Sequence, residues 1–373
     1  MLQGNVFGII FSNMHDDLIG ELTQVRTTGS IPFGGRYRFI DFHLSNFVNS
    51  GITEVGVITK MNYQSLMDHL GSGREWDLDR KNGGLYIIPP FTHMGASLYR
   101  GRIEALSGVL PLVRRSKAGY IVMADCNVLY NVDLTGLVES HIASGADITA
   151  AYSRQSVNSH GRWNGMTFSL AHDSRITDVV IGGSDGGEVN SAINLFVMNK
   201  SFFLSMVETH LSRSQYSFKR DVLQARRDEL RIYGYPIEDY CVEIDSLRGY
   251  YDANMQLLDR SVRDQLFKRE TPVYTKVRDE APARYGLEAS VENSLIAEGC
   301  IIEGEVRDSV LFRGVRVGRG AKVVGSILMQ GTVVGEGADL GYVVADKDVH
   351  FSEGRLLRGY EAYPMYITKG SHV

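Results

Sequence analysis

Long apolar runs are missing from this chain of 373 residues. No stretch approaches the ~18 consecutive apolar residues that a membrane-spanning helix requires, and residues 1–11 lack the basic start and apolar core of a signal peptide. We therefore expect neither a membrane span nor export. Cysteine is also scarce, and the wide separation of Cys126, Cys241 and Cys300 fits neither a disulfide framework nor a zinc site. The simplest expectation is a reducing, cytoplasmic location.

A basic excess is absent as well. The chain has 39 lysine and arginine residues against 44 aspartate and glutamate residues, which gives a net charge of −5 at pH 7. Nucleic acid is therefore not an expected partner, because its phosphates bind to basic surfaces. Hydrophobic residues make up 43% of the chain and charged residues 22%, as in ordinary globular proteins. The length indicates two domains.

Short apolar runs alternate with helical patterns from residue 1 to about residue 265. Residues 102–113 predict a helix, because Ile103, Leu106 and Val113 fall on one face. This alternation predicts an α/β domain with a mostly parallel sheet, whose ligands bind at the carboxyl ends of the strands. The predicted strands lie at residues 6–11, 54–59, 120–123, 148–152 and 193–198.

A different period begins near residue 285. The sequence Val-Gly-Arg-Gly-Ala at residues 317–321 is followed seventeen residues later by Val-Gly-Glu-Gly-Ala at 334–338. Aliphatic residues also recur at intervals of six, and a hexapeptide period of this kind predicts a parallel β-helix with stacked inward side chains. The expected domains are therefore 1–265, a charged linker at 266–284, and a β-helix at 285–373. The residues spaced by six are Leu311, Val317 and Val323, and then Leu328, Val334 and Leu340.

Residues 32–52 carry a resemblance to a known family. They include Pro-Phe-Gly-Gly-Arg-Tyr-Arg-Phe-Ile-Asp-Phe at 32–42, Leu-Ser-Asn at 44–46 and Val-Asn-Ser-Gly-Ile at 48–52. This stretch resembles the ADP-glucose pyrophosphorylases (glucose-1-phosphate adenylyltransferases), which convert ATP and glucose 1-phosphate to ADP-glucose and pyrophosphate. The β-helix resembles that family's carboxyl-terminal domain. The resemblance implies a nucleotidyltransferase domain, with a Rossmann-like mixed and mostly parallel sheet, followed by a left-handed parallel β-helix.

The loop after the first strand departs from the family's pattern. Where the family has Gly-Gly-x-Gly-Thr-Arg, residues 12–17 read Ser-Asn-Met-His-Asp-Asp. Asp16 and Asp17 would face a polyphosphate, and one like-charge contact at ~4 Å costs about 1–4 kcal/mol depending on the local dielectric. Alternatively, a metal bound to these aspartates lets the loop work differently. The phosphate-binding lysine of the family's Arg-Ala-Lys-Pro falls on Thr28 when Arg26 is matched.

The positions that resemble the family's metal ligands are also altered. The aspartate of Gly-Asp-His-Ile-Tyr is matched by Asn127, although a shifted register would offer Asp125 instead. The second carboxylate is matched by Glu243, whose longer arm misplaces a Mg²⁺ ion that demands near-octahedral geometry. The resemblance therefore implies no intact metal site here and Mg²⁺ in a catalytic partner. The alternative is a site formed by Asp125 and Glu243.

The sugar-phosphate motifs are changed in the same way. Gly182 stands at the lysine of the family's Phe-Val-Glu-Lys-Pro, and residues 192–194 read Ala-Ile-Asn in place of Ser-Met-Gly. Tyr99 lies in a retained Tyr-Arg-Gly, and Glu104 replaces a usual aspartate. Tyr99 and Glu104 are therefore the remaining candidates for substrate binding.

Several basic residues match positions near the family's regulator site, or lie in the tail where the family adds further basic residues. They imply a site for an anionic metabolite effector, although solvated surface arginines are the common alternative. The candidates are Arg26, Arg36, Arg38, His69, Arg355 and Arg358.

The altered motifs resemble the GlgD-type glycogen-biosynthesis proteins, degenerate relatives found beside a catalytic subunit. This implies a regulatory, non-catalytic chain in a heterotetramer with that subunit, or one that self-associates, with a coupling free energy of ~1–3 kcal/mol. One alternative is an active enzyme in which Arg26 replaces the lysine. A stand-alone sensor is another. A hexapeptide acyltransferase is disfavoured, because residues 285–349 contain no histidine.

Overall fold

The computed structural model describes residues 2, 4–90, 99–157, 165–182 and 187–373. Among these residues, every helix is too short or too polar to span a bilayer. The chain divides into two compact units, each built from several segments. The first contains Met1–Met14, Ile40–Glu243 and Lys268–Tyr274, and the second contains His15–Phe39, Ile244–Phe267 and Thr275–Val373.

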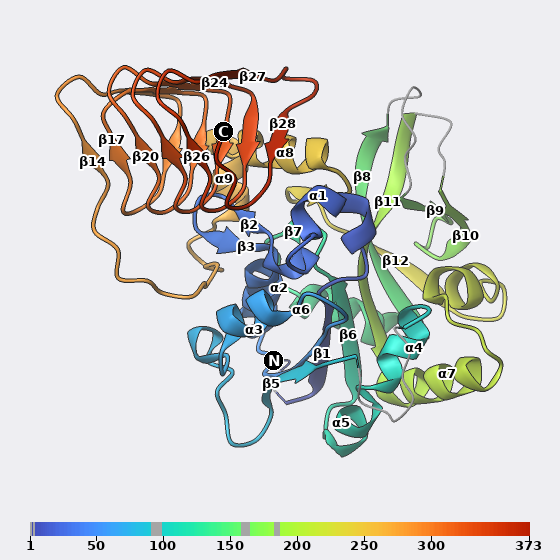
Figure 1. Cartoon of the computed structure of the whole chain (residues 1–373). Helices are drawn as coiled ribbons and strands as arrows, with labels where there is room; N and C mark the ends of the chain where they lie inside the picture. The colour runs from blue at the N-terminus through green and yellow to red at the C-terminus, as the bar shows by residue number, and fades with distance from the viewer. Residues whose placement is uncertain (1, 3, 91–98, 158–164, 183–186) are drawn as a thin grey trace. The chain divides into compact units, whose positions relative to one another are not determined.

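A nine-stranded mixed sheet forms the centre of the first unit (Figure 1). All five predicted strands are present, although β8 continues five residues beyond its predicted end and β11 begins six residues before its predicted start. The middle of the sheet is parallel as expected. The main path runs in the order β10 (Ile176–Ile181), β9 (Met166–Leu170), β11 (Gly187–Asn199), β6 (Tyr120–Asp125), β1 (Val6–Phe11), β4 (Glu54–Ile58) and β5 (Gly84–Ile88), while β8 (Ile148–Val157) pairs with β11 and with β12 (Ile232–Pro236).

The register of the strands shows which residues lie at the amino ends and which at the carboxyl ends of the parallel strands; we call these two ends of the sheet its amino edge and its carboxyl edge. Strand β1 is parallel to β6, with Phe11 opposite Asp125, and parallel to β4, with Phe7 opposite Glu54. Strand β11 is antiparallel to β6 and places Phe196 opposite Met123. All six residues of β1 are buried, as expected for a strand covered on both faces.

Helices α4 (Arg102–Ser107), α5 (Leu110–Arg115) and α7 (Lys200–Ser212) cover one face of the sheet. Their apolar residues join one buried cluster with alternate residues of β1, such as Phe7 and Ile9, because alternate strand residues share a face. Helix α6 (Thr135–Ser144) packs on the other face, where His141 Nδ1 lies 2.9 Å from the hydroxyl of Thr149.

The helix predicted over residues 102–113 is interrupted, so that prediction was wrong in one detail. Gly108 ends α4, and its N–H donates to the carbonyls of Ala105 and Leu106. Pro111 then lies in the first turn of α5, where the missing N–H of proline costs nothing. Helix α2 (Phe39–Asn49) also belongs to this unit, apart from its first residue, Phe39, which is assigned to the second unit. The remaining elements of the first unit are α3 (Gln64–Leu70), η3 (Arg74–Trp76), β7 (Val128–Tyr130), η4 (Phe218–Gln224) and β13 (Cys241–Glu243).

The second unit contains the β-helix, whose coils are stacked in Figure 1. Three five-stranded parallel sheets form its faces, as the hexapeptide period predicts. The first is β14 (Arg284–Tyr285), β17 (Ile301–Ile302), β20 (Arg316–Val317), β23 (Val333–Val334) and β26 (His350–Phe351); the second is β15 (Ser290–Glu292), β18 (Glu305–Arg307), β21 (Lys322–Val324), β24 (Asp339–Gly341) and β27 (Leu356–Arg358); the third is β16 (Leu295–Ile296), β19 (Val310–Leu311), β22 (Ile327–Leu328), β25 (Val343–Ala345) and β28 (Met365–Ile367).

The inward side chains of the coils form the core of the β-helix. Val317 pairs with Val334, and Val323 pairs with Leu340, each seventeen residues further along the chain. All six residues that the sequence predicts to point inward are buried, so the hexapeptide interpretation is confirmed. Stacking of like aliphatic residues along the coils stabilises each coil through its neighbours.

Two segments that precede the β-helix in sequence belong to the same compact unit. The hydroxyl of Tyr250 donates to the carbonyl of Pro32 at 2.8 Å, and that of Tyr251 donates to the carbonyl of Gly325 at 2.7 Å. The predicted domain boundaries follow chain order, whereas the compact units interleave. The elements of these segments are η1 (Asp16–Ile19), α1 (Gly20–Thr23), η2 (Thr28–Ser30), β2 (Pro32–Phe33), β3 (Tyr37–Arg38), α8 (Leu247–Gln256) and α9 (Arg260–Leu266).

Candidate functional site

The carboxyl edge of the central sheet gathers polar residues from several strands. Asp125 ends β6 opposite Phe11, the last residue of β1, and Asn13 follows two residues after β1. Because β11 is antiparallel to β6, its Asn194 lies at the same edge. We call this region the carboxyl-edge site and define it by Asn13, Arg102, Asp125, Asn127, Asn194 and Glu243.

Arg102 forms a buried ion pair with Asp125 in this site. The guanidinium Nη2 donates to Oδ2 of the carboxylate, and the two side chains are only 5% and 0% exposed. The guanidinium also lies over the ring of Phe11, with 4.6 Å between its carbon and the ring centroid. The resemblance had drawn attention to Tyr99 and Glu104 on either side, and Arg102 was missed because its role depends on the fold.

Asn127 and Glu243 meet across a short antiparallel pair. Strand β13 pairs with β7 so that Glu243 lies opposite Val128. The Asn127 amide Nδ2 donates to Glu243 Oε1 at 3.2 Å. An amide donor satisfies the carboxylate directly, whereas an aspartate at the same position would repel it unless a cation lay between them.

A second cation lies close to these carboxylates. Burial lowers the pKa of Lys219, and repulsion from Arg102 lowers it further, while Asp125 and Glu243 act in the opposite direction. Burial also lowers the pKa of the nearby His43 to about 4, so His43 is neutral at pH 7. Lys219 comes from η4, and its position at this edge is set by the fold rather than by a motif.

The metal site that the resemblance offers as an alternative does not fit these residues. Asp125 already neutralises Arg102, and Glu243 accepts from Asn127. In the described part of the chain, no group of three or more histidine, cysteine, aspartate or glutamate side chains is arranged to hold a metal ion. A Mg²⁺ ion needs several oxygen ligands in octahedral geometry, and here it would lie beside a fixed guanidinium.

Several buried polar atoms of the carboxyl-edge site have no hydrogen-bond partner among the described residues. Buried polar groups are normally hydrogen-bonded, so these atoms mark a place for water or for a ligand. Asn194 also has φ of 54°, which suits the glycine that the family has there. The atoms are Asn13 Nδ2, Arg102 Nη1, Asn127 Oδ1 and Asn194 Oδ1.

Comparison with known proteins identifies the family. Residues 19–180 match the Nucleotidyl transferase family, and residues 279–360 match the family described as GlmU-like, C-terminal hexapeptide. The chain is 33% identical to the glycogen biosynthesis protein GlgD of Bacillus subtilis (strain 168), over 99% of this chain and 97% of that protein. The chain belongs to the ADP-glucose pyrophosphorylase (glucose-1-phosphate adenylyltransferase) family.

Other relatives include both GlgD proteins and glucose-1-phosphate adenylyltransferases. The chain is 34% identical to the GlgD protein of Geobacillus stearothermophilus, over 86% of this chain and 84% of the relative. It is 30% identical to the glucose-1-phosphate adenylyltransferase of Bacillus cytotoxicus, over 95% of each. The resemblance to GlgD-type members is confirmed, but overall identity separates the two kinds only slightly.

The candidate substrate residues contact their own chain segment. Glu104 accepts from the backbone N–H of Arg100 at 2.6 Å and from its Nη2 at 2.8 Å, and these hydrogen bonds lower the pKa of Glu104. The hydroxyl of Tyr99 donates to the carbonyl of Pro89 at 3.2 Å. Gly182 follows β10 with φ of 72° and offers no side chain for the sugar phosphate.

The aspartates of the altered loop are used in different ways. The Asp16 carboxylate accepts from the backbone N–H of Thr28 at 2.8 Å and from its hydroxyl at 2.7 Å. Asp17 is exposed. Two positions at which the family binds phosphate therefore bind each other, and the expectation that Asp16 points toward a polyphosphate is corrected.

Four of the candidate effector residues already have acidic partners. Arg26 is buried and pairs with Asp346 at 2.8 Å, while Arg38 is half-buried and Arg355 exposed. The other pairs are Arg36 with Glu298 at 2.9 Å, Arg358 with Asp339 at 2.6 Å, and His69 with Asp41 at 2.6 Å. His69 lies in the first compact unit, whereas the five arginines lie in the second.

A basic cluster in the second unit adds Lys347 and Lys369, which the effector prediction did not name, to Arg26 and Arg38. Burial lowers the pKa of Lys347 to about 7, and repulsion from Arg38, Arg26 and Lys369 contributes. Asp346, the acidic neighbour, already accepts from Arg26 and from the hydroxyl of Tyr366 at 2.9 Å. Lys347 and Lys369 carry no motif, because loops distant in sequence bring them to Arg38.

Proposed function

We propose that this chain is a regulatory, non-catalytic subunit of glucose-1-phosphate adenylyltransferase that modulates ADP-glucose synthesis for glycogen in the cytoplasm. The observation that carries the proposal is the buried ion pair between Arg102 and Asp125. Catalysis of phosphoryl transfer consists largely of positioning the phosphates and neutralising their charge with metal ions and basic groups. Here the carboxylate at the end of β6 holds an internal cation instead of an external one.

The positive charge of Arg102 also opposes the binding of a metal ion at Asp125. A divalent ion ~4 Å from a guanidinium is repelled by about 2 kcal/mol in water and about 8 kcal/mol at an effective dielectric of 20. The hydrogen bond from Asn127 to Glu243 removes a second reason to recruit a metal. The site is therefore neutralised without magnesium, which we assign to the catalytic partner.

The loop that binds phosphate in the family supports the same conclusion. Thr28 replaces the lysine, and its backbone N–H and hydroxyl both donate to Asp16. A carboxylate now occupies the hydrogen-bonding groups that a phosphate would use. The loop supplies neither an amine nor free donors at residue 28.

The partner we propose is a catalytic subunit of the same family, joined in a heterotetramer. Large apolar side chains are exposed on the first coil of the β-helix, where Leu287 is fully exposed and Tyr285 is 52% exposed. Apolar groups left in water at the end of a solenoid favour association. Self-association through the same coil is the alternative outcome.

An anionic metabolite is the proposed effector, and the basic cluster of Arg38, Lys347 and Lys369 is where we place it. Lys347 is half-buried beside like charges, so a bound anion would relieve the repulsion. An effector that binds one conformation of the tetramer more tightly shifts the equilibrium toward that conformation. The regulatory influence is such a coupling free energy.

ADP-glucose synthesis by the catalytic subunit, measured with and without this chain, tests the proposal. We expect a change in maximal rate, substrate affinity or effector response when the chain is added. The chain alone should release pyrophosphate at background rate. No change in any of the three parameters would contradict the regulatory role.

One observation favours a second candidate, a catalytically active enzyme with an atypical site. The unpaired polar atoms of Asn13, Asn127 and Asn194 leave the carboxyl-edge site able to hydrogen-bond a substrate, and Lys219 supplies a cation there. A turnover assay on the purified chain with ATP, glucose 1-phosphate and Mg²⁺ separates the two candidates. Robust pyrophosphate release would establish the second and exclude the first.

A further inference from the structure

A pocket at the opposite edge of the central sheet is distinct from the sites described above. It lies where β1, β4 and β5 begin, and it is lined by the turn that leads into β5 and by the link between α5 and β6. Its volume is about 620 Å³. This is within the usual range for small-molecule sites. We call it the amino-edge pocket, and its lining includes Glu54, Lys81, Tyr86, Arg115, Ser116 and Lys117.

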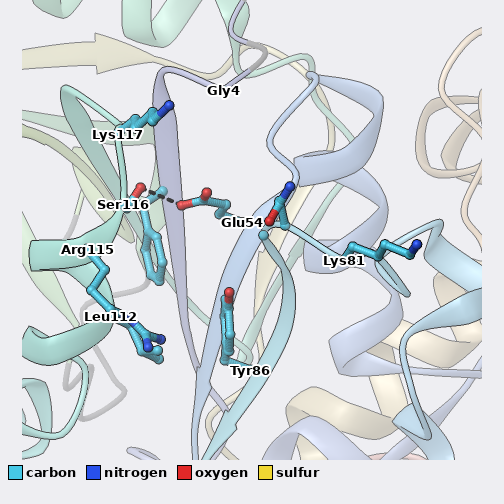
Figure 2. Close-up of a pocket in the computed structure, with 11 residues that line it drawn as sticks. Gly4, Glu54, Lys81, Tyr86, Leu112, Arg115, Ser116 and Lys117 are labelled. Atoms are coloured by element: carbon cyan, nitrogen blue, oxygen red, sulfur yellow. Dashed lines mark hydrogen bonds between the residues drawn. The ribbon is translucent and has the colours of Figure 1, made fainter.

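The charge of the amino-edge pocket is opposite to that of the whole chain. Arg115, Lys117 and Lys81 line it against one carboxylate, that of Glu54, although the chain carries a net charge of −5. Figure 2 shows Arg115 and Lys117 on one side, Lys81 on the other, and Glu54 with Tyr86 between them.

The basic groups of the pocket lack acidic partners in the part of the chain that the structure describes. Within the described residues, Arg115, Lys117 and Lys81 form no ion pair, whereas the neighbouring Arg114 pairs with Glu208. Arg115 ends α5 and Lys117 follows it in the link to β6, whereas Lys81 comes from the turn before β5. An anion that enters the pocket can therefore bind to them without displacing a carboxylate.

The centre of the pocket offers groups that hydrogen-bond hydroxyls. The hydroxyl of Ser116 donates to Glu54 Oε2 (dashed in Figure 2) and is itself held by the backbone N–H of Ala118 at 3.1 Å. Glu54 is thereby fixed through one oxygen, and the described residues make no hydrogen bond to the other. Tyr86 adds a phenol group, and the buried ring of Phe7 forms part of the wall.

We propose that the amino-edge pocket binds a small anion that also carries hydroxyl groups, of the class of phosphorylated or carboxylated polyols. The anionic group binds by charge-assisted hydrogen bonds to a basic side chain of this wall, where Lys117 and Arg115 lie on either side of Ser116 (Figure 2). Glu54 accepts from the ligand's hydroxyls, and it disfavours anions that have none. The site is separate from the carboxyl-edge site, because strands β1 and β4 run from one edge to the other, and it does not depend on the regulatory role.

Titration calorimetry on the full chain tests the proposal with three probes: sorbitol 6-phosphate, inorganic phosphate and sorbitol. We expect sorbitol 6-phosphate to bind more tightly than phosphate, and sorbitol alone not to bind measurably. The double substitution Arg115→Gln and Lys117→Gln should lower the affinity for sorbitol 6-phosphate by about tenfold or more. Glu54→Gln should increase the affinity for inorganic phosphate and so reduce the difference in affinity between inorganic phosphate and sorbitol 6-phosphate.

Arg114→Gln is the matched control, because Arg114 lies in the same segment but pairs with Glu208 outside the pocket. It should leave all three affinities unchanged. Thermal melting of each variant verifies the fold. Binding that survives the double substitution, or no binding of any probe at millimolar concentration, overturns the proposal and leaves the regulatory proposal untouched.

Discussion

Arg102 and Asp125 form the buried ion pair of the carboxyl-edge site. Both are buried, so each neutralises a charge that would otherwise be costly to bury. The pair belongs to the fold's stability as much as to its function. Substitution of either partner therefore tests both together.

We predict that Arg102→Ala destabilises the chain by about 3–5 kcal/mol, because Asp125 is left as an unpaired buried carboxylate. Mg²⁺ should restore part of the lost stability, since a cation that binds only the folded state raises the melting temperature. The measurement is thermal unfolding with and without Mg²⁺. Wild type should show no such response, and Arg114→Ala, which breaks an exposed pair, should lose less than about 1 kcal/mol. If Mg²⁺ has no effect on Arg102→Ala, the idea that Arg102 stands in for a metal is wrong.

Lys347 predicts a pH-dependent response. Its pKa is lowered to about 7 in the folded chain, against about 10.4 when unfolded, so the unfolded state binds more protons between these values. This group therefore makes stability rise with pH across that window, and its destabilising effect is fully present below pH 7. A bound anion favours the charged lysine.

Sulfate affinity, measured by calorimetry from pH 6 to pH 9, should accordingly fall as Lys347 loses its proton. Sulfate keeps a constant charge over this range, so the titration reports on the protein. Lys347→Met should bind sulfate weakly at every pH and flatten the profile. A profile in Lys347→Met identical to that of wild type would place the anion elsewhere.

Among the secondary-structure elements, the segment from η1 to η2 is held in place by contacts of its own side chains. Asp16 at the start of η1 binds Thr28 at the start of η2 through two hydrogen bonds. The segment is joined to the β-helix by the buried pair of Arg26 and Asp346. A loop that carries substrate phosphates in the family is here held by its own side chains.

We predict that Asp16→Ala lowers the free energy of unfolding by about 1–3 kcal/mol, because a backbone N–H and a hydroxyl lose their acceptor. Asp17→Ala is the natural control, since Asp17 is exposed, and it should change stability by less than about 0.5 kcal/mol. Chemical denaturation measures both. Equal effects of the two substitutions would show that the Asp16 contacts do not stabilise the segment.

At the scale of the whole molecule, the first coil of the β-helix leaves apolar groups in water. Tyr285, Leu287 and Val291 are all exposed on this coil. The hydrophobic effect favours covering them with another chain. The β-helix would thus contribute to assembly rather than to chemistry.

We predict that Leu287→Asp weakens association with the proposed catalytic subunit at least tenfold without changing the melting temperature, because Leu287 is fully exposed and makes no contribution to the buried core. Light scattering coupled to size-exclusion chromatography measures the assembly. Leu356→Asp, at another exposed apolar position, is the control. Retention of the full assembly by Leu287→Asp would remove the first coil from the interface.

Sequence periodicity was sufficient for most of the architecture. The six-residue spacing of Val317, Val323 and their equivalents predicted the buried stack of the β-helix, and short apolar runs predicted five of the nine strands of the sheet. Local patterns succeed here because burial repeats with the geometry of each element. The helix predicted over residues 102–113 failed in one detail, since Gly108 ends it locally.

The altered motifs could be read from the sequence, but their consequences could not. Thr28, Asn127 and Glu243 were identified by matching family positions, whereas the contact of Thr28 with Asp16 and that of Asn127 with Glu243 required coordinates. Arg102 and Lys219 carried no signal at all. Their side chains gain meaning from what surrounds them, not from their spacing along the chain.

The family, the hexapeptide repeat and the altered residue types at the family's phosphate-binding and metal-binding positions follow from the sequence alone, because each depends on residue identity and order. How the remaining charges are balanced depends on the fold. Coulomb energy depends on distance and burial, and the acidic partners of Arg102 and Arg26 lie 23 and 320 residues away along the chain. The amino-edge pocket exists for the same reason, since Glu54, Lys81 and Lys117 meet only where the strands begin.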